Sequence, residues 1–374
     1  MEALLDKLKF MKKGSLLFIF LICCCFKNFA QQFEVKIDSA LNTNAAFFKA
    51  SSALVQYTGR IDFSNTNAPR CWSPGVYATM KFKGDKITCI INDQELWGKN
   101  HNYLEVVVDN EKKRIQTKYK KNYISIFNLT DKEHTLTICK NTESNIGFIE
   151  FAGVFCQKLL QPSARPVRKI EFIGNSITCG ASSDMSEIPC GKGVWHDQHN
   201  AYMAYGPVTA RALNAQWYLS SVSGIGLIHS CCNMNIIMPP VFDKIDMRGD
   251  SLPWNFKHYQ PDVVTVCLGQ NDGIQDSIKF CSAYVDFIKT LRGHYPKAQI
   301  VLLTSPMADE KLKAVLKNQL TGVLNFLHQS GDKKVSKFFF SRSYNGGCDY
   351  HPSLSEHQLI AAELTAYLKE LMHW

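Results

Sequence analysis

Four segments of the chain carry residue types that could act together on an acyl group. They contain Ser176, Gly224, Asn271 and His351, in that order. A serine hydroxyl is a poor nucleophile near neutral pH and needs a base within hydrogen-bond reach, and histidine is the usual one. A glycine lets backbone N–H groups approach a substrate oxygen, and an asparagine amide can donate to a developing oxyanion. The set predicts nucleophilic acyl transfer, which requires no cofactor and no metal ion.

Each of these residues taken alone has a plainer interpretation. Ser176 could cap a following helix, and Gly224 and the Asn271-Asp272 pair could simply form turns. What favours chemistry is position, because the first three segments each directly follow a predicted strand. Ligands of open parallel sheets bind at the carboxyl ends of strands.

The elements that must position these residues fall into two regions of different pattern. From about residue 31 to 160, short alternating stretches are separated by turn residues and no long helical period occurs, which predicts a β-sandwich. The stretches cover residues 76–82, 87–91, 104–108, 123–127 and 135–139, with turns at 83–85, 109–110 and 130–132.

From about residue 168, apolar strands alternate with helical periods, which predicts a parallel sheet covered on both faces. Residues 262–268 form a continuous apolar run, as a buried parallel strand requires. The other predicted strands cover 169–173, 217–220, 299–304 and 337–340, and the predicted helices cover 202–213, 277–291, 309–328 and 354–372.

The order Ser, Gly, Asn, His resembles the four blocks of the SGNH (GDSL-type) hydrolase superfamily. More narrowly, the chain is similar to carbohydrate esterase family 2. The segments that carry this likeness are Tyr57-Thr58-Gly59-Arg60, Ile173-Gly174-Asn175-Ser176-Ile177-Thr178-Cys179-Gly180, Ala204-Tyr205-Gly206 and Gly347-Cys348-Asp349-Tyr350-His351-Pro352. The resemblance implies a jelly-roll β-sandwich over 31–162, followed by a three-layer αβα SGNH hydrolase domain over 168–374. It also implies a serine esterase that removes O-acetyl groups from plant polysaccharides such as xylan or glucomannan, or from their oligosaccharides.

The sequence departs from the superfamily at two positions. Asn175 precedes the serine where Asp is usual, and we expect little loss from this change. The superfamily's triad acid usually lies three residues before the histidine, where this chain has Cys348. Asp349 lies only two residues before His351, so either its carboxylate reaches round to the imidazole or a backbone carbonyl orients the ring. Asp349 stays among the candidate catalytic residues, although the resemblance implies a Ser–His dyad for some members and we favour that arrangement.

Several other residues are weaker candidates. Tyr350 and Trp254 are predicted to bind substrate by stacking on a sugar ring, as Trp195 could, although core packing is an equally good explanation for the tryptophans. His196 and His199 flank Asp197 in H-x-x-H spacing, but they lie in a predicted loop where facing geometry is unsupported, so no metal site is predicted.

The N-terminus is predicted to be a signal peptide over residues 1–30. Lys12 and Lys13 precede 11 apolar residues over 16–26, a run too short to span a bilayer, and Ala30 offers a small residue for cleavage. A membrane anchor and a lipoprotein cysteine are less favoured alternatives. The prediction is therefore a secreted or periplasmic protein whose mature part does not insert into a membrane.

The composition is that of an ordinary globular protein. The 374 residues are 45% hydrophobic and 20% charged, and the net charge of +9 is scattered, with no basic run of the nucleic-acid-binding type. Three of the 14 cysteines lie within residues 1–30, and Cys89, Cys139, Cys156 and Cys267 fit buried apolar positions as well as disulfides. The role of the Cys231-Cys232 pair and the oligomeric state are left open.

Two other functions remain open at this point. The first is an esterase that acts on lipid or cell-wall glycan, for which we expect an exposed apolar run that the four segments lack. The second is a non-catalytic glycan-binding protein, against which the presence of both Ser176 and His351 argues.

Overall fold

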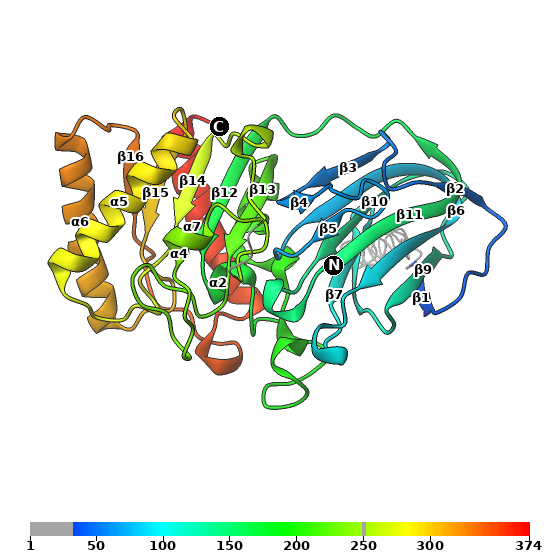
Figure 1. Cartoon of the computed structure of the whole chain (residues 1–374), viewed down its shortest axis with the longest axis horizontal. Coiled ribbons are helices and arrows are strands. Elements are labelled where there is room, and N and C mark those ends of the chain that lie inside the picture. Colours follow the sequence, from blue (N-terminus) through cyan, green and yellow to red (C-terminus); the bar gives the residue numbers. More distant parts are fainter. Residues whose placement is uncertain (1–32, 249–251) are drawn as a thin grey trace, which may run out of the picture.

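The computed structural model describes residues 33–248 and 252–374, so the signal peptide predicted over residues 1–30 lies outside the described residues. Within the described part of the chain, no helix is long and apolar enough to cross a membrane. Two regions lie side by side, an antiparallel β-rich region and a parallel sheet with helices on both faces (Figure 1). The predicted fold class is confirmed.

The β-rich region contains an 11-stranded antiparallel network in which the strand order along the main path is β4-β5-β11-β6-β10-β7-β8. Its apolar side chains alternate inward and form one core, which includes Met80, Phe82, Ile124 and Leu136. The strands are β1 (Glu34–Asp38), β2 (Ala46–Phe48), β3 (Val55–Thr58), β4 (Ile61–Asp62), β5 (Arg70–Cys71), β6 (Tyr77–Asp93), β7 (Tyr103–Val108), β8 (Glu111–Gln116), β9 (Lys121–Phe127), β10 (Glu133–Lys140) and β11 (Ile149–Leu160).

The turn predicted at residues 83–85 is wrong, because β6 runs through it as one strand of 17 residues. Its first part pairs with β10, as in Met80↔Leu136, and its second part pairs with β9, as in Ile87↔Ile126. The chain bends at Gly84, whose φ of 126° is open to glycine, instead of reversing there. A strand that changes partners in this way joins the two parts of the β-rich region.

The second region is built on five parallel strands in the order β13-β12-β14-β15-β16. Successive residues of one strand enter cores on opposite faces of the sheet, as Ile300 and Val301 do on β15. This explains the continuous apolar pattern of these strands in the sequence. They are β12 (Arg168–Gly174), β13 (Ala215–Ser221), β14 (Val263–Val266), β15 (Gln299–Leu303) and β16 (Val335–Phe338).

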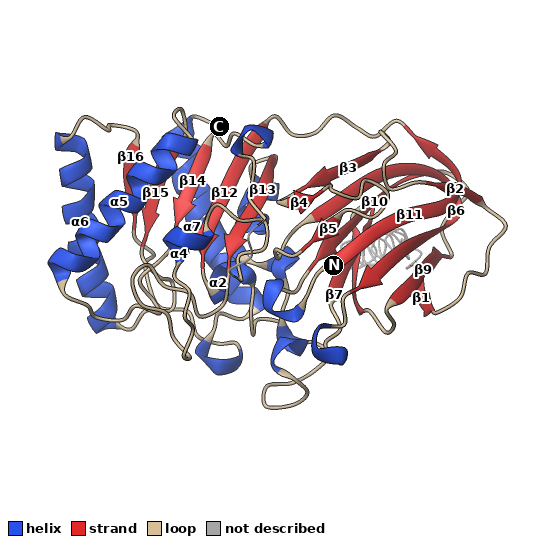
Figure 2. Ribbon diagram, in the orientation of Figure 1, coloured by secondary structure: helices blue, strands red, loops and turns tan. Residues whose placement is uncertain are grey.

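Helices cover both faces of this sheet (Figure 2). The α-helices are α2 (Ser176–Cys179), α3 (Tyr205–Ala212), α4 (Met238–Val241), α5 (Ser277–His294), α6 (Glu310–Gln329) and α7 (Leu354–Met372), and the 3-10 turns are η1 (Leu96–Gly98), η2 (Ser144–Ile146), η3 (Trp195–Gln198), η4 (Ala201–Met203), η5 (Phe256–His258) and η6 (Cys348–Tyr350). Side-chain caps begin the three long helices, with Asp276 before α5, Asp309 before α6 and Ser353 before α7.

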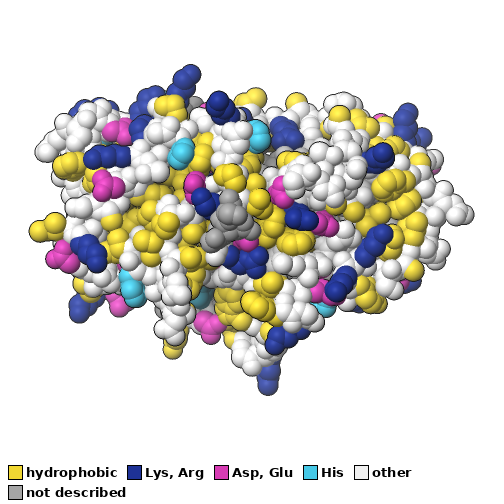
Figure 3. Space-filling view, viewed as in Figure 1, with side chains coloured by type: hydrophobic (Ala, Val, Ile, Leu, Met, Phe, Trp, Pro, Cys, Tyr) yellow, Lys and Arg dark blue, Asp and Glu magenta, His cyan; other side chains and the backbone are white. Residues whose placement is uncertain are grey.

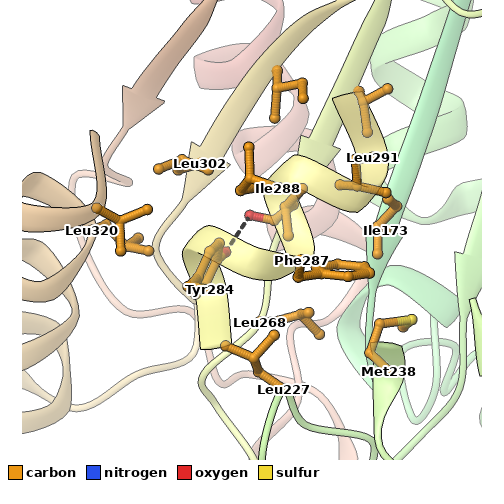
Figure 4. Close-up of a cluster of buried hydrophobic side chains, with 14 of the residues drawn as sticks. Ile173, Leu227, Met238, Leu268, Tyr284, Phe287, Ile288, Leu291, Leu302 and Leu320 are labelled. Atoms are coloured by element: carbon orange, nitrogen blue, oxygen red, sulfur yellow. Dashed lines mark hydrogen bonds between the residues drawn. The ribbon is translucent and has the colours of Figure 1, made fainter. Parts of the chain in front are cut away.

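Helices α5 and α6 bury one core of the sheet and α3 and α7 bury the other. In the first core, Phe287 and Ile288 of α5 lie among Ile173, Leu302 and Leu320, as Figure 4 shows. Tyr284 also lies there, and its hydroxyl donates to the backbone oxygen of Val266 at 3.3 Å. Helices α5 and α6 thus pack on the face of the sheet opposite α3 and α7. This packing fixes the positions of the strand ends.

The two regions are joined by a buried ion pair. Arg60, which follows β3, is 1% exposed and donates to Glu171 Oε1 on β12 at 2.8 Å. The same guanidinium donates to the backbone oxygens of Phe242 and Lys244. Because the planar guanidinium of the β-rich region donates to three fixed acceptors of the second region, the junction has one defined arrangement.

Aromatic side chains fill the rest of this junction. Tyr77 of β6 stacks on Trp217 of β13 at 4.1 Å between ring centroids, and Trp217 Nε1 donates to Gly75 O at 2.9 Å. Trp254 is 7% exposed and belongs to a buried cluster with Trp72 and Tyr218. The ring of Trp254 is therefore covered by protein and not presented to solvent.

On the one face of the molecule that Figure 3 shows, charged side chains of one sign do not gather into a single patch. On the face shown in Figure 3, Lys and Arg side chains are interspersed with Asp and Glu side chains. Such a surface matches the scattered charge of the sequence.

We predict that Arg60→Met lowers the free energy of unfolding by about 3–5 kcal/mol, because it leaves the Glu171 carboxylate buried without its partner. Urea unfolding followed by tryptophan fluorescence would measure the loss. The matched control is Lys36→Met, which breaks an exposed 3.0 Å pair with Asp38 and should cost at most about 1 kcal/mol. Equal losses in the two variants would contradict the importance of the buried pair.

Candidate active site

Ser176 begins α2 at the end of strand β12. Asn175 caps this short helix, because its Oδ1 accepts from the N–H of Ile177 at 3.3 Å. Gly174 is required just before it, since a Cβ there would lie 2.1 Å from Thr178 Oγ1. The tight strand-to-helix turn places the serine hydroxyl in a pocket, although the residue is only 7% exposed.

His351 lies against the serine from the other end of the sequence. Its Nε2 is 2.8 Å from Ser176 Oγ, and its Nδ1 is 3.0 Å from the backbone oxygen of Asp349. Since a carbonyl only accepts, Nδ1 carries the proton and Nε2 is left to accept from the serine. Burial lowers the pKa of His351, by more than the hydrogen bond to the Asp349 carbonyl raises it. The imidazole is therefore a neutral base at neutral pH.

The Asp349 carboxylate points elsewhere in this arrangement. Its Oδ2 accepts from Ser182 Oγ at 3.5 Å, while its backbone oxygen serves the imidazole. Asp349 and Tyr350 have φ of 50° and 58°, so the chain forms a tight left-handed turn before His351. Of the two arrangements that the sequence left open, the structure has the backbone carbonyl at Nδ1.

The turn formed by residues 348–351, which carries His351, is held by a disulfide. Cys348 is bonded to Cys190, and its N–H donates to Ser182 O at 2.8 Å. Its own carbonyl accepts from the N–H of His351 at 2.9 Å. Directly after the turn, Ser353 and Glu356 form a reciprocal cap that starts α7. Both ends of the turn are thus tied to fixed structure.

Gly224 and Asn271 line the same pocket of about 400 Å³ as Ser176 and His351. Gly224 has a φ of 82°, which a residue with a side chain rarely adopts, and a Cβ there would lie 2.6 Å from Met234 Sδ. Asn271 Nδ2 donates to the backbone oxygen of Ile225 at 2.8 Å, which orients the amide and leaves its second N–H available. The structure therefore brings all four residues together.

Asp272 fixes the loop that follows Gly224. The position of Asp272 after Asn271 in the sequence did not reveal this role. Its carboxylate accepts from the backbone N–H groups of Leu227, Ile228 and His229 at 2.7–3.0 Å. Three consecutive amide donors on one carboxylate hold the loop in a single conformation. The sequence suggested only a turn-forming pair at this point.

Glu143 comes from the β-rich region and was not predicted. It is fully buried, and it accepts from the N–H of Ser223 at 2.7 Å and from the Ser223 hydroxyl. His199 Nε2 lies 3.4 Å from its Oε1. Burial alone would raise the pKa of Glu143, but the adjacent His199 and the hydrogen bonds from Ser223 outweigh it and lower that pKa. The ionised carboxylate of Glu143, in the β-rich region, thus binds Ser223, the residue directly before Gly224 in the second region.

The turn that carries Glu143 also supplies a pocket residue. Asn145 lines the pocket together with Ser176 and His351. Lys140 stabilises this turn, because its Nζ donates to the carbonyls of Trp72, Thr142 and Glu143. Burial lowers the pKa of Lys140 to about 7. No local sequence pattern marks this turn, since its importance depends on the neighbouring region.

The remaining aromatic candidates separate into two groups. Trp195 lines the pocket at 43% exposure, and Tyr350 is 79% exposed one residue before His351. Trp254 lies in the junction cluster and does not line this pocket. Its apolar ring is used to join the two regions, which accounts for the difference from the predicted sugar contact.

His196 and His199 do not form a metal site in the described residues, where no group of three metal-ligating side chains occurs. Burial lowers the pKa of His196 to about 4. His199 belongs to the Glu143 network instead. Arg114 of β8 donates to the backbone oxygens of Asp197 and His199, so the β-rich region also holds this segment.

The cysteines of the described chain include two disulfides, Cys190–Cys348 and Cys231–Cys232. Of the two alternatives that the sequence left open for Cys89, Cys139, Cys156 and Cys267, the structure has free, buried thiols.

We predict that the double change Cys190→Ala and Cys348→Ala lowers the free energy of unfolding by about 2–5 kcal/mol, because a cross-link that closes a long loop is lost. Urea unfolding without reductant would measure this. Cys281→Ala, which removes a free and partly exposed thiol of α5, is the control and should shift the midpoint far less. Coincident urea unfolding curves for the two variants would contradict a stabilising role of the Cys190–Cys348 disulfide.

The chain matches known proteins along most of its length. Residues 57–166 match the family model "Carbohydrate esterase 2 N-terminal", and residues 172–329 match the "GDSL-like Lipase/Acylhydrolase family". A cellulase/esterase CelE of Acetivibrio thermocellus is 33% identical over 340 residues, which cover 86% of this chain and 40% of that protein. The chain thus spans less than half of that relative. An acetylxylan esterase / glucomannan deacetylase of Cellvibrio japonicus is 28% identical over 87% of this chain and 91% of that protein.

Solved structures agree with these matches. A family two carbohydrate esterase from Clostridium thermocellum, in complex with cellohexaose, is 30% identical with a TM-score of 0.79, covering 86% of this chain and 99% of that one. A family two carbohydrate esterase from Cellvibrio japonicus is 25% identical with a TM-score of 0.79, covering 92% and 99%. Because the chain is 30% identical to a solved family two carbohydrate esterase and covers 99% of it, the chain belongs to carbohydrate esterase family 2 and is a carboxylic ester hydrolase.

Proposed function

We propose that this esterase removes O-acetyl groups from plant polysaccharides such as xylan or glucomannan, or from their oligosaccharides, with Ser176 as nucleophile and His351 as base. The observation that carries the proposal is the 2.8 Å contact between Ser176 Oγ and His351 Nε2 inside a pocket that also holds Gly224 and Asn271. The substrate class is supported by relatives named as acetylxylan esterase / glucomannan deacetylase.

The first half-reaction forms an acetyl-enzyme. Ser176 Oγ attacks the acetyl carbonyl carbon while its proton moves to His351 Nε2. The negative charge that develops on the carbonyl oxygen is met by the backbone N–H groups of Ser176 and Gly224 and by the second N–H of Asn271. The bond to the sugar oxygen then breaks, and His351 returns the proton to that oxygen, which leaves as a hydroxyl.

The second half-reaction reverses these roles with water. His351 takes a proton from a water molecule, whose oxygen attacks the acetyl carbon of the ester on Ser176. The same donors stabilise the second oxyanion. The bond to Ser176 Oγ breaks, His351 protonates that oxygen, and acetate leaves. No cofactor takes part in either half.

We also assign supporting roles around this centre. Trp195, which lines the pocket, and Tyr350, which is exposed one residue before His351, are proposed to contact the sugar ring. Residues 31–162 and 168–374 are proposed to act as one unit, because Glu143 of the first part holds Ser223 of the second. A polysaccharide substrate also fits export through the N-terminal signal sequence proposed for residues 1–30.

We predict that Ser176→Ala abolishes acetyl ester hydrolysis, to below about 1% of the wild-type rate, because no other hydroxyl takes its place opposite His351. Acetate release from acetylated xylan and from 4-nitrophenyl acetate would be measured, with circular dichroism as the check on folding. Activity retained above that level in a folded protein would refute the assignment.

We predict that Asp349→Asn slows the reaction by no more than about tenfold, because the imidazole contacts the backbone oxygen and not the carboxylate. Loss of a full triad acid can cost about 10,000-fold. Since burial lowers the pKa of His351, the acid limb of kcat/KM should lie below the usual histidine pKa of about 6.5 in both proteins. Below that limb the imidazole is protonated and cannot accept the serine proton, so activity falls with falling pH.

The rate and pH profile of Asp349→Asn together decide this point. A decrease in kcat of more than about 1000-fold with unchanged folding would make Asp349 the third member of a triad. An acid limb that moves only in the variant would lead to the same conclusion.

A further inference from the structure

A second hollow adjoins the pocket that holds Ser176. It encloses about 510 Å³ and is lined only by residues between Ile228 and Ile237. The two hollows share Cys231, Cys232 and Met234 in their walls. The second hollow therefore lies directly beside the pocket that holds Ser176.

The loop that forms the hollow is already fixed in the free protein. Asp272 holds its start through the N–H groups of Ile228 and His229. Ser230 Oγ accepts from the N–H of Gly226 at 3.0 Å and donates to Ile236 O at 2.6 Å, which ties the two ends of the loop together. A preformed surface binds a ligand without first having to order itself.

The chemistry of the lining selects the class of ligand. None of its residues is Asp, Glu, Lys or Arg, and His229 is the one ionisable side chain in its lining, so the hollow holds no permanent charge to pair with an ionic group. Asn233 and Asn235 are exposed, and their side-chain amides have no hydrogen-bond partner within the described residues. Each amide can both donate to and accept from a hydroxyl. The Met234 thioether and the cystine offer a polarisable apolar surface between them.

The hollow is also connected to the proposed oxyanion site. His229 Nδ1 lies 3.3 Å from the backbone oxygen of Asn271. Met234 packs on Gly224, where a Cβ would lie 2.6 Å from its Sδ. The loop that lines the hollow is therefore in contact with both Gly224 and the segment that carries Asn271.

We propose that this hollow is a subsite for neutral pyranose residues that continue the glycan beyond the acetylated sugar, with Asn233 and Asn235 as its hydrogen-bonding residues. The proposal rests on the proposed deacetylase function. If the hollow binds sugars in this way, residues 228–237 determine how strongly the enzyme prefers acetylated oligosaccharides over small acetyl esters.

The test compares the double change Asn233→Ala and Asn235→Ala with wild type on acetylated xylo- and glucomanno-oligosaccharides of two to six sugars and on 4-nitrophenyl acetate. In the wild type, kcat/KM should rise with chain length. In the double variant the rise should shrink about tenfold or more, mainly through KM, because two neutral hydrogen bonds are lost. Hydrolysis of 4-nitrophenyl acetate, which cannot reach the hollow, should stay within about twofold.

The matched control changes Asn42 and Asn44 to Ala. These exposed asparagines have the same spacing and lie between β1 and β2, at the far end of the β-rich region (Figure 1). This control should behave as wild type on every substrate.

Three results would overturn the subsite. They are a wild-type kcat/KM that is independent of chain length, an unchanged length dependence in the double variant, and an equal loss on 4-nitrophenyl acetate. Failure of the proposed function itself has a different signature, since the wild type would then hydrolyse 4-nitrophenyl acetate but release no acetate from an acetylated oligosaccharide of any length. As a second readout, the Kd of non-acetylated oligosaccharides should weaken about tenfold when the two asparagines are changed in the Ser176→Ala background.

Discussion

The pocket depends above all on one buried carboxylate that crosses between the two regions. Glu143 stands on a turn of the β-rich region, yet both of its oxygens are used by the helical region, through Ser223 and His199. A buried charge is tolerated only when it is fully paired, so the two regions must meet in one arrangement for this network to form. Gly224 follows Ser223 directly, and the same turn brings Asn145 to the pocket wall. The β-rich region is thus part of the proposed active site and not an appendage to it.

The histidine is held by backbone rather than by charge. A carboxylate at Nδ1 would stabilise the imidazolium that forms during the reaction, whereas the Asp349 carbonyl offers only a dipole. We infer that orientation has become the more important contribution of this turn. Its two left-handed residues, the Cys190–Cys348 disulfide and the reciprocal cap at Ser353 all restrict where the ring can point. The restricted conformation of this turn therefore offsets the absence of a carboxylate at His351 Nδ1.

The surroundings of the pocket fit a substrate that is large, neutral and rich in hydroxyl groups. Trp195 is exposed and lines the pocket, and Tyr350 is exposed one residue before His351. The hollow that adjoins the pocket carries the amides of Asn233 and Asn235 and no Asp, Glu, Lys or Arg. The loop of residues 228–237 places Asn233 and Asn235 among apolar side chains, so it offers hydrogen-bonding groups that a sugar can use and a lipid chain cannot. The proposal of a glycan ester therefore rests on the walls of the pocket as well as on the relatives.

Much of this protein could be predicted from sequence because the relevant signals are local. Alternating and continuous apolar patterns identified most strands and the long helices, and the order of Ser176, Gly224, Asn271 and His351 indicated both the chemistry and the family. The bend at Gly84 was mistaken for a turn, because glycine alone does not tell whether a strand ends or changes partners. The roles of Glu143 and Asn145, the burial of Trp254 and the partner of His351 Nδ1 were decided only by tertiary structure. Each of them depends on a contact between segments distant in sequence, or on the direction in which a side chain leaves a tight turn, and neither is encoded in the spacing of residues along the chain.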